Sequence, residues 1–144
     1  MALITWRDSY STGVEYFDKE HEKIVILINE LYEVCRDHLA EDVVHRVITE
    51  LLEYTVYHFE HEEKAMEAVN YAYLEEQREQ HDILKKKVQE FKDRLDQREE
   101  GVAAELYLFL RDWLIKHILE YDRRYKSALK NKEIKELLGG SGKV

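Results

Sequence analysis

Histidines and carboxylates recur at helical spacing inside otherwise apolar stripes of this sequence. His58 and Glu62 lie four residues apart, on one row of a predicted helix. A core of leucine, isoleucine and valine has no use for such side chains, because each buried polar group without a partner costs about 1–3 kcal/mol. Six inward-facing residues of this kind are distributed over four predicted helices: His21, His58, Glu62, His81, His117 and Asp122.

Nitrogen and carboxylate ligands that face one another favour a metal site. A single histidine on an apolar face is more often a hydrogen-bonded core residue than a ligand. The set is different, because helix bundles build metal sites from facing side chains at one level. This mixture of donors suits iron, manganese or zinc rather than calcium. Two carboxylates able to bridge favour a pair of metals over a single ion.

Four amphipathic stretches must position these residues. Apolar residues recur in them at spacings of three and four. The stretches cover about residues 18–38, 41–69, 73–99 and 102–130. Their links are short, so the sequence predicts an all-α fold, an antiparallel up-down-up-down four-helix bundle. We expect residues 1–17 to form an extended arm, 132–138 a short C-terminal helix and 139–144 a flexible tail.

Composition narrows the class of protein. A length of 144 residues suits one domain, so residues 1–144 are expected to fold as a unit. The absence of proline and the presence of only five glycines indicate an almost wholly helical chain. A net charge of −9 disfavours binding to nucleic acid or to an anionic membrane. With no signal-peptide pattern and a single cysteine, Cys35, we expect a cytoplasmic protein, and a monomer.

Four segments of the chain resemble the hemerythrin family, in particular its bacterial single-domain members. They are residues 6–14 (WRDSYSTGV), 18–21 (DKEH), 58–63 (HFEHEE) and 113–122 (WLIKHILEYD). The resemblance extends over about residues 4–126. His-x-x-x-Glu in the second helix and His-x-x-x-x-Asp in the fourth are highly specific for that family when they occur together at this separation.

The resemblance implies a non-heme centre of two iron ions. Each ion would be held by one histidine pair, and the two would be bridged by two carboxylates and an oxo or hydroxo group. The implied pairs are His21 with His58 and His81 with His117, and the implied bridges are Glu62 and Asp122. The resemblance also implies a dry pocket for dioxygen, walled by Trp113, Leu114 and Ile118.

One position departs from the family pattern. The third helix of the family normally supplies His-x-x-x-His, whereas this chain has Gln77 before His81. An amide oxygen is a weaker, neutral ligand than imidazole, and a water molecule could take its place. The loss of one ligand would give both metals an exchangeable position and favour autoxidation or peroxide chemistry. A tolerated substitution that leaves a complete site is equally compatible with the sequence.

Three functions therefore stay open. The first is a binding protein, rather than an enzyme, that carries, stores or senses dioxygen and has a reductant protein as a partner. The second is a di-iron peroxidase or oxidase, favoured by Gln77. The third is a metal-sequestering or purely structural bundle. Helical geometry places His61 on the flank of the second helix, where we expect a solvated residue rather than a group that supports the metal ligands.

Overall fold

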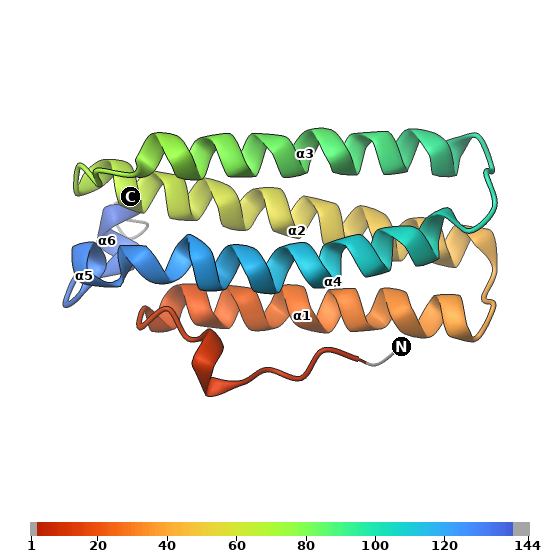
Figure 1. The fold of residues 1–144 in the computed structure, drawn as a ribbon, viewed down its shortest axis with the longest axis horizontal. Coiled ribbons are helices and arrows are strands. Elements are labelled where there is room, and N and C mark those ends of the chain that lie inside the picture. The colour runs from red at the N-terminus through yellow and green to blue at the C-terminus, as the bar shows by residue number, and fades with distance from the viewer. Residues whose placement is uncertain (1–2, 140–144) are drawn as a thin grey trace.

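Four long helices form an antiparallel bundle in the structure, a computed structural model that describes residues 3–139 (Figure 1). They are α1 (Glu15–Arg36), α2 (Glu41–Ala68), α3 (Leu74–Asp96) and α4 (Val102–Glu120). The shorter elements are η1 (Asp8–Tyr10), η2 (Asp122–Tyr125), α5 (Lys126–Leu129) and α6 (Ile134–Leu137). Helix α1 packs against α2 and α4, and α3 packs against the same two helices. The predicted all-α four-helix bundle is confirmed.

The apolar core consists of two clusters with a polar layer between them. The larger cluster fills most of the bundle and includes Ile24, Leu84 and Ile118. The smaller one, around Phe17 and Tyr125, closes the end of the bundle from which α5 and α6 emerge. Along the chain, His21, Glu62 and Asp122 each come between a residue of the larger cluster and one of the smaller cluster, whereas His58 and His117 are flanked by residues of the larger cluster. The layer is therefore enclosed by apolar side chains on both sides.

The fourth helix is shorter than the predicted stretch 102–130. It ends at Glu120, and a 3-10 turn, η2, carries the chain on from Asp122. In a continuous α-helix Asp122 would lie about 140° round the axis from His117, because each residue turns the chain by about 100°. The change to a 3-10 turn brings Asp122 into the interior, where its side chain is 1% exposed. The break therefore lets both residues face one site.

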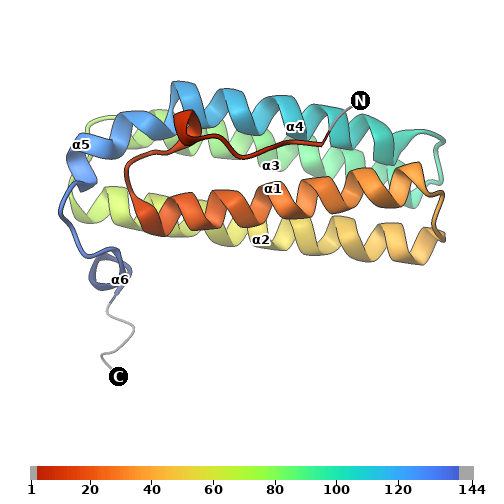
Figure 2. The ribbon, with the colours of Figure 1, turned by 90° about the horizontal axis from the view of Figure 1, so that it is seen from below.

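The N-terminal arm runs along the bundle beside α1 and α4 (Figure 2). The side-chain amide of Asn29 in α1 pairs with the backbone of Ile4, accepting from its N–H at 2.8 Å and donating to its carbonyl at 2.9 Å. Nearer to α1, the carboxylate of Asp18 accepts hydrogen bonds from the side chains of Ser11 and Thr12. The arm is thus attached to α1 at two points, and it ends at residue 14 rather than at the predicted 17.

At the other end of the chain, α6 lies within the predicted short helix 132–138. The predicted flexible tail, apart from Gly139, lies outside the described residues. No helix in the described range combines the length and the apolar character that crossing a bilayer would require.

Candidate metal centre

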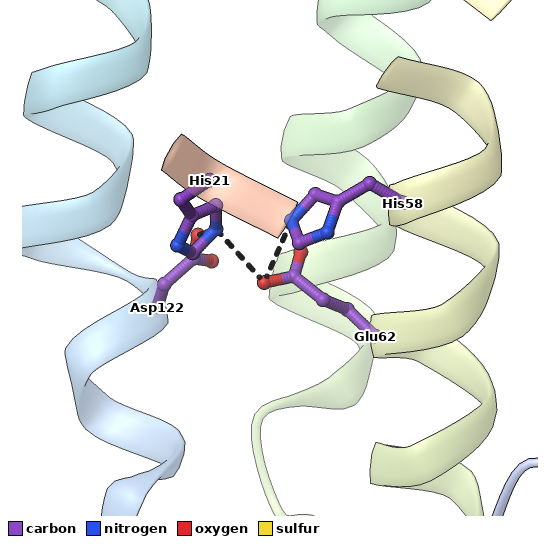
Figure 3. Close-up of side chains that lie close together, drawn as sticks. All are labelled: His21, His58, Glu62 and Asp122. Atoms are coloured by element: carbon purple, nitrogen blue, oxygen red, sulfur yellow. Dashed lines mark ion pairs between the residues drawn. The ribbon is translucent and has the colours of Figure 1, made fainter. Parts of the chain in front are cut away.

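Six side chains from all four helices and η2 meet in the polar layer of the bundle. Each is at most 3% exposed, although every one can carry a charge. They are the six residues that the sequence predicted: His21, His58, Glu62, His81, His117 and Asp122. Figure 3 shows four of them: His21 from α1 and His58 from α2 converge on Glu62, and Asp122 from η2 faces them from the other side.

The first group of potential ligands is His21, His58, Glu62 and Asp122, whose ligand atoms all lie within 4.8 Å of one another. His21 Nε2 is 3.0 Å from Asp122 Oδ2 and 3.3 Å from Glu62 Oε2. His58 Nε2 is 3.2 Å from that same Glu62 oxygen. Two imidazole nitrogens and two carboxylate oxygens therefore surround one point, as a metal site requires.

The second group contains His81, His117 and Asp122, and it satisfies the same distance limit with one residue fewer. His117 Nε2 lies 3.0 Å from Asp122 Oδ1. His81 Nε2 lies 3.4 Å from Glu62 Oε1, so Glu62 also reaches toward this group. The two groups thus bring His21 together with His58, and His81 together with His117.

Glu62 and Asp122 each direct one oxygen toward each histidine pair. Glu62 presents Oε2 to His21 and His58, and Oε1 to His81. Asp122 presents Oδ2 to His21 and Oδ1 to His117. A carboxylate that divides its oxygens between two sets of nitrogen donors has the arrangement of a bridge between two cations. The side chains thus fit a pair of metals better than a single one.

The hydrogen bonding of this layer is incomplete without a cation. Buried atoms that lack a partner with hydrogen-bond geometry include the Nε2 atoms of all four histidines and Glu62 Oε1. Buried nitrogen and oxygen atoms left without partners are costly, and they are rare in folded proteins. Because these orphaned atoms all belong to the two groups, and because imidazole and carboxylate are suitable donors for iron, the residues fit a metal pair.

Charge in the metal-free centre is arranged to attract cations. Burial lowers the pKa of His21, but the adjacent carboxylates of Asp122 and Glu62 outweigh that effect and raise the pKa to about 10. Burial and the charge of Glu62 raise the pKa of Asp122, yet its histidine neighbours prevail and bring it to about 2. The two carboxylates are therefore ionised at neutral pH, inside an apolar bundle, and they require positive charge beside them.

Two further carboxylates contact histidines of the two groups from the outside. Glu20 Oε1 lies 2.7 Å from His58 Nδ1, and Glu63 Oε2 lies 2.7 Å from His81 Nδ1. When Nδ1 donates to a carboxylate, the lone pair of the ring is on Nε2, which here faces the centre. Sequence reasoning missed both residues. Their only signal is their position, since Glu20 directly precedes His21 and Glu63 directly follows Glu62.

His61 belongs to the same arrangement, so the expectation of a solvated flank residue is wrong. Its side chain is 17% exposed, and its Nδ1 lies 2.6 Å from the second oxygen of Glu20. Its ring also packs against the rings of Tyr16 and Tyr57. Glu20 therefore accepts from two imidazoles at once, one facing the centre and one near the surface.

Tyr125 supports one of the two central carboxylates. Its hydroxyl donates to Glu62 Oε2 at 2.6 Å, and its side chain is completely buried. Burial and the nearby charges of Glu62 and Asp122 raise the pKa of this phenol well above its ordinary value. Tyr125 thus stays protonated and fixes the orientation of the Glu62 carboxylate.

Gln77 also lies in the polar layer and is 1% exposed. Its amide nitrogen donates to Asp122 Oδ1 at 3.1 Å, while its amide oxygen has no partner. The nitrogen, rather than the oxygen, therefore points at the carboxylate that reaches both groups of potential ligands.

Aromatic and aliphatic side chains enclose the second group. Trp113 stacks on His117 with ring centres 4.4 Å apart, and Phe59 stacks on His81 at 3.8 Å. Leu114 and Ile118, from the predicted dioxygen pocket, are at most 5% exposed and belong to the main apolar cluster. The surroundings of the polar layer are apolar, which strengthens electrostatic interactions inside it.

Comparisons with known proteins agree with this geometry. Residues 12–129 match the family model described as hemerythrin HHE cation binding domain. The bacteriohemerythrin of Pseudomonas aeruginosa is 34% identical over 133 residues, which cover 91% of this chain and 84% of that protein. A hemerythrin-like protein of Naegleria gruberi is 32% identical over 124 residues, which cover 86% of this chain and 92% of the other. The crystal structure of a wild-type hemerythrin matches at a TM-score of 0.83 with 28% identity, over 89% of this chain and 98% of that one.

Proposed function

The chain belongs to the hemerythrin family, and on that premise we propose that it is a non-heme di-iron protein that binds dioxygen. The observation that carries the proposal is the division of the Glu62 and Asp122 oxygens between two histidine pairs. In its reduced state, a bridged iron pair supplies two electrons to dioxygen. The buried layer is the one place among the described residues where six potential ligands of this kind converge.

The ligand set of this proposal is the one expected from the sequence. His21 and His58 would hold one iron, and His81 and His117 the other. Glu62 and Asp122 would bridge the two ions, with an oxo or hydroxo group as a third bridge. The proposal is supported by the buried Nε2 atoms of these four histidines, none of which has a hydrogen-bond partner. Glu20 and Glu63 would keep two of the rings oriented, and Tyr125 would orient Glu62.

Apolar packing around the layer suits binding better than turnover of a large substrate. Trp113, Leu114 and Ile118 would keep water and protons away from bound dioxygen, and so slow its conversion to reduced products. We propose carriage, storage or sensing of dioxygen rather than catalysis. A reductant protein would return the oxidised centre to its active state.

The wider setting of the protein is part of the same proposal. We propose one hemerythrin-like domain that acts as a cytoplasmic monomer, with neither nucleic acid nor membrane as a partner. A net charge of −9 supports the last point. The single free cysteine, Cys35, is compatible with a reducing compartment.

A peroxidase is the second candidate, because Gln77 turns its amide nitrogen to Asp122 and so leaves the His81–His117 side one protein ligand short. The test is to reduce the iron-loaded protein without oxygen, add dioxygen in a stopped-flow instrument, and then remove it. A carrier gives an absorbance change that reverses when oxygen is removed, with little consumption of added peroxide. Irreversible oxidation together with sustained peroxide turnover would contradict the carrier and favour the enzyme.

A further inference from the structure

We infer that Gln77 is not a metal ligand but a hydrogen-bond acceptor for a small protic ligand, such as water or hydrogen peroxide, on the His81–His117 side. The inference rests on the proposed function, since it presupposes a metal on each side of the layer. It adds to that function a ligand position beside Gln77, and it names the chemistry that this position selects.

The orientation of the Gln77 amide is fixed by chemistry. A carboxylate only accepts hydrogen bonds, so the amide group facing Asp122 Oδ1 at 3.1 Å must be the nitrogen. If the side chain rotated to offer its oxygen to a metal, the amide N–H groups would lose this acceptor inside a layer where Gln77 is 1% exposed. The hydrogen bond to Asp122 therefore prevents the amide oxygen from binding the metal that Asp122 would bind.

The amide oxygen itself is left buried and without a partner. A buried carbonyl oxygen in this position requires a donor, and no side chain of the described residues supplies one. Asp122 Oδ1, to which the Gln77 nitrogen donates, is also the oxygen that faces His117, so the Gln77 amide lies beside the smaller ligand group of His81, His117 and Asp122. An external ligand that carries a hydrogen would complete both the hydrogen bonding of Gln77 and the shell of the metal.

This arrangement discriminates among small ligands by their protons. Water, hydroxide and hydrogen peroxide can donate to the Gln77 oxygen, whereas azide at neutral pH has only lone pairs to present. The neighbouring Asp122 Oδ1 is also an acceptor, and the Gln77 nitrogen is already engaged with it. Aprotic anions are therefore disfavoured on the His81–His117 side. On the His21–His58 side, the Gln77 oxygen imposes no such restriction.

The experiment compares the full-length parent protein with Gln77→Leu and Gln77→His. Leucine removes the acceptor but leaves the shell incomplete, while histidine fills the shell. Gln77→Met replaces the leucine variant if circular dichroism shows that branching at this position disturbs the fold. Gln89→Leu is the matched control, because Gln89 lies on the exposed face of the same helix. Each protein is first assayed for bound metal, so that all comparisons are made at two ions per chain.

Two readouts then follow. The number of azide ions bound per diferric protein is determined from absorbance. Exchangeable water is measured by the relaxation of water protons in a solution of the protein loaded with Mn²⁺. The inference expects one azide per metal pair in the parent, in Gln77→His and in the control, but two in Gln77→Leu. It also expects the relaxation effect to fall in Gln77→His, since one water position is lost.

The outcomes separate this inference from the proposed function. Fewer than two metals in the parent would contradict the proposed function before any ligand is added. With two metals bound, one azide in both the parent and Gln77→Leu, or two in both, would overturn the acceptor role of Gln77. An unchanged relaxation effect in Gln77→His would overturn the exchangeable site on that side. In each of these last cases the dioxygen-binding proposal would stand.

Discussion

Glu20 lies with one carboxylate oxygen 2.7 Å from Nδ1 of His58, on the side of that ring away from the polar layer. Because Glu20 also accepts from His61, it joins a central imidazole to one near the surface. Removing such an outer carboxylate leaves the ligand in place but releases its ring orientation and weakens its basicity.

We therefore expect Glu20→Ala to lower metal affinity on the His21–His58 side by about 10- to 100-fold while the protein stays folded. Competition for the bound metal with a chelator, followed by absorbance, measures the effect. Glu22→Ala, an exposed substitution on the same helix, serves as the control. Equal metal retention in the two variants would show that Glu20 merely packs beside His58.

Replacing Glu62 should affect both the metals and the metal-free fold. Glu62→Ala removes a carboxylate that faces both histidine pairs and that accepts the hydrogen bond of the Tyr125 hydroxyl. We expect metal content to fall below two ions per chain, and the metal-free protein to lose roughly 1–3 kcal/mol of unfolding free energy.

Two companion variants divide that effect into its parts. Tyr125→Phe deletes only the hydrogen bond to Glu62, so it should cost about 1 kcal/mol and leave the metal content unchanged. Glu60→Ala, at an exposed position of α2, should change neither quantity. Denaturant titration and metal analysis of all three proteins test these statements, and unchanged iron in Glu62→Ala would remove Glu62 from the ligand set.

The pH dependence of stability should differ between the metal-free and the metal-loaded protein. His21 has a pKa of about 10 in the folded protein, above its ordinary value of 6.5, so its contribution to stability is complete below about pH 6.5 and disappears as pH rises toward 10. Asp122 has a pKa of about 2 in the folded protein, below its ordinary value of 3.8, so its contribution to stability is present above pH 3.8 and disappears as pH falls toward 2.

The metal-free protein should accordingly be most stable between about pH 4 and 6.5. Its melting temperature should already be lower at about pH 9 than in that range. Bound cations replace the proton of His21, so the metal-loaded protein should lack this particular loss. Thermal melts of the two forms across this range make the comparison. The same alkaline decline in both forms would mean that the charges of the polar layer do not govern it.

Asn29 offers a way to loosen the N-terminal arm without touching the centre. Its two hydrogen bonds to Ile4 attach the arm whose Trp6 ring stacks 6.5 Å from the ring of His21. Asn29→Ala should cost roughly 1–3 kcal/mol and speed amide hydrogen exchange in the arm, relative to the exposed control Glu30→Ala. Exchange rates that match those of the control would show that the arm is held elsewhere.

Local spacing was enough to predict the four long helices and to place candidate ligands on their inner faces. His58 and Glu62 lie on one row of a single helix, so their common face follows from helical geometry alone. The same periodicity located all four long helices. Asp122 was less accessible to this reasoning, because it faces inward only after α4 ends at Glu120, in a stretch without proline or glycine to mark the break.

Contacts between helices could not be derived from periodicity. Glu20 and His58 are 38 residues apart in the chain, and their pairing depends on the rotation of α1 against α2. His61 was misjudged for the same reason, since its partner also lies on α1. The orientation of the Gln77 amide likewise depends on Asp122, which is 45 residues away.

The central claim is that the polar layer holds two metals bridged by Glu62 and Asp122. Its most direct test is X-ray absorption spectroscopy, with metal analysis, of the protein purified from iron-replete cells. The account predicts two irons per chain and an iron–iron distance of about 3–4 Å, the separation usual for bridged pairs. A single metal per chain, or two without a metal–metal distance in that range, would contradict it.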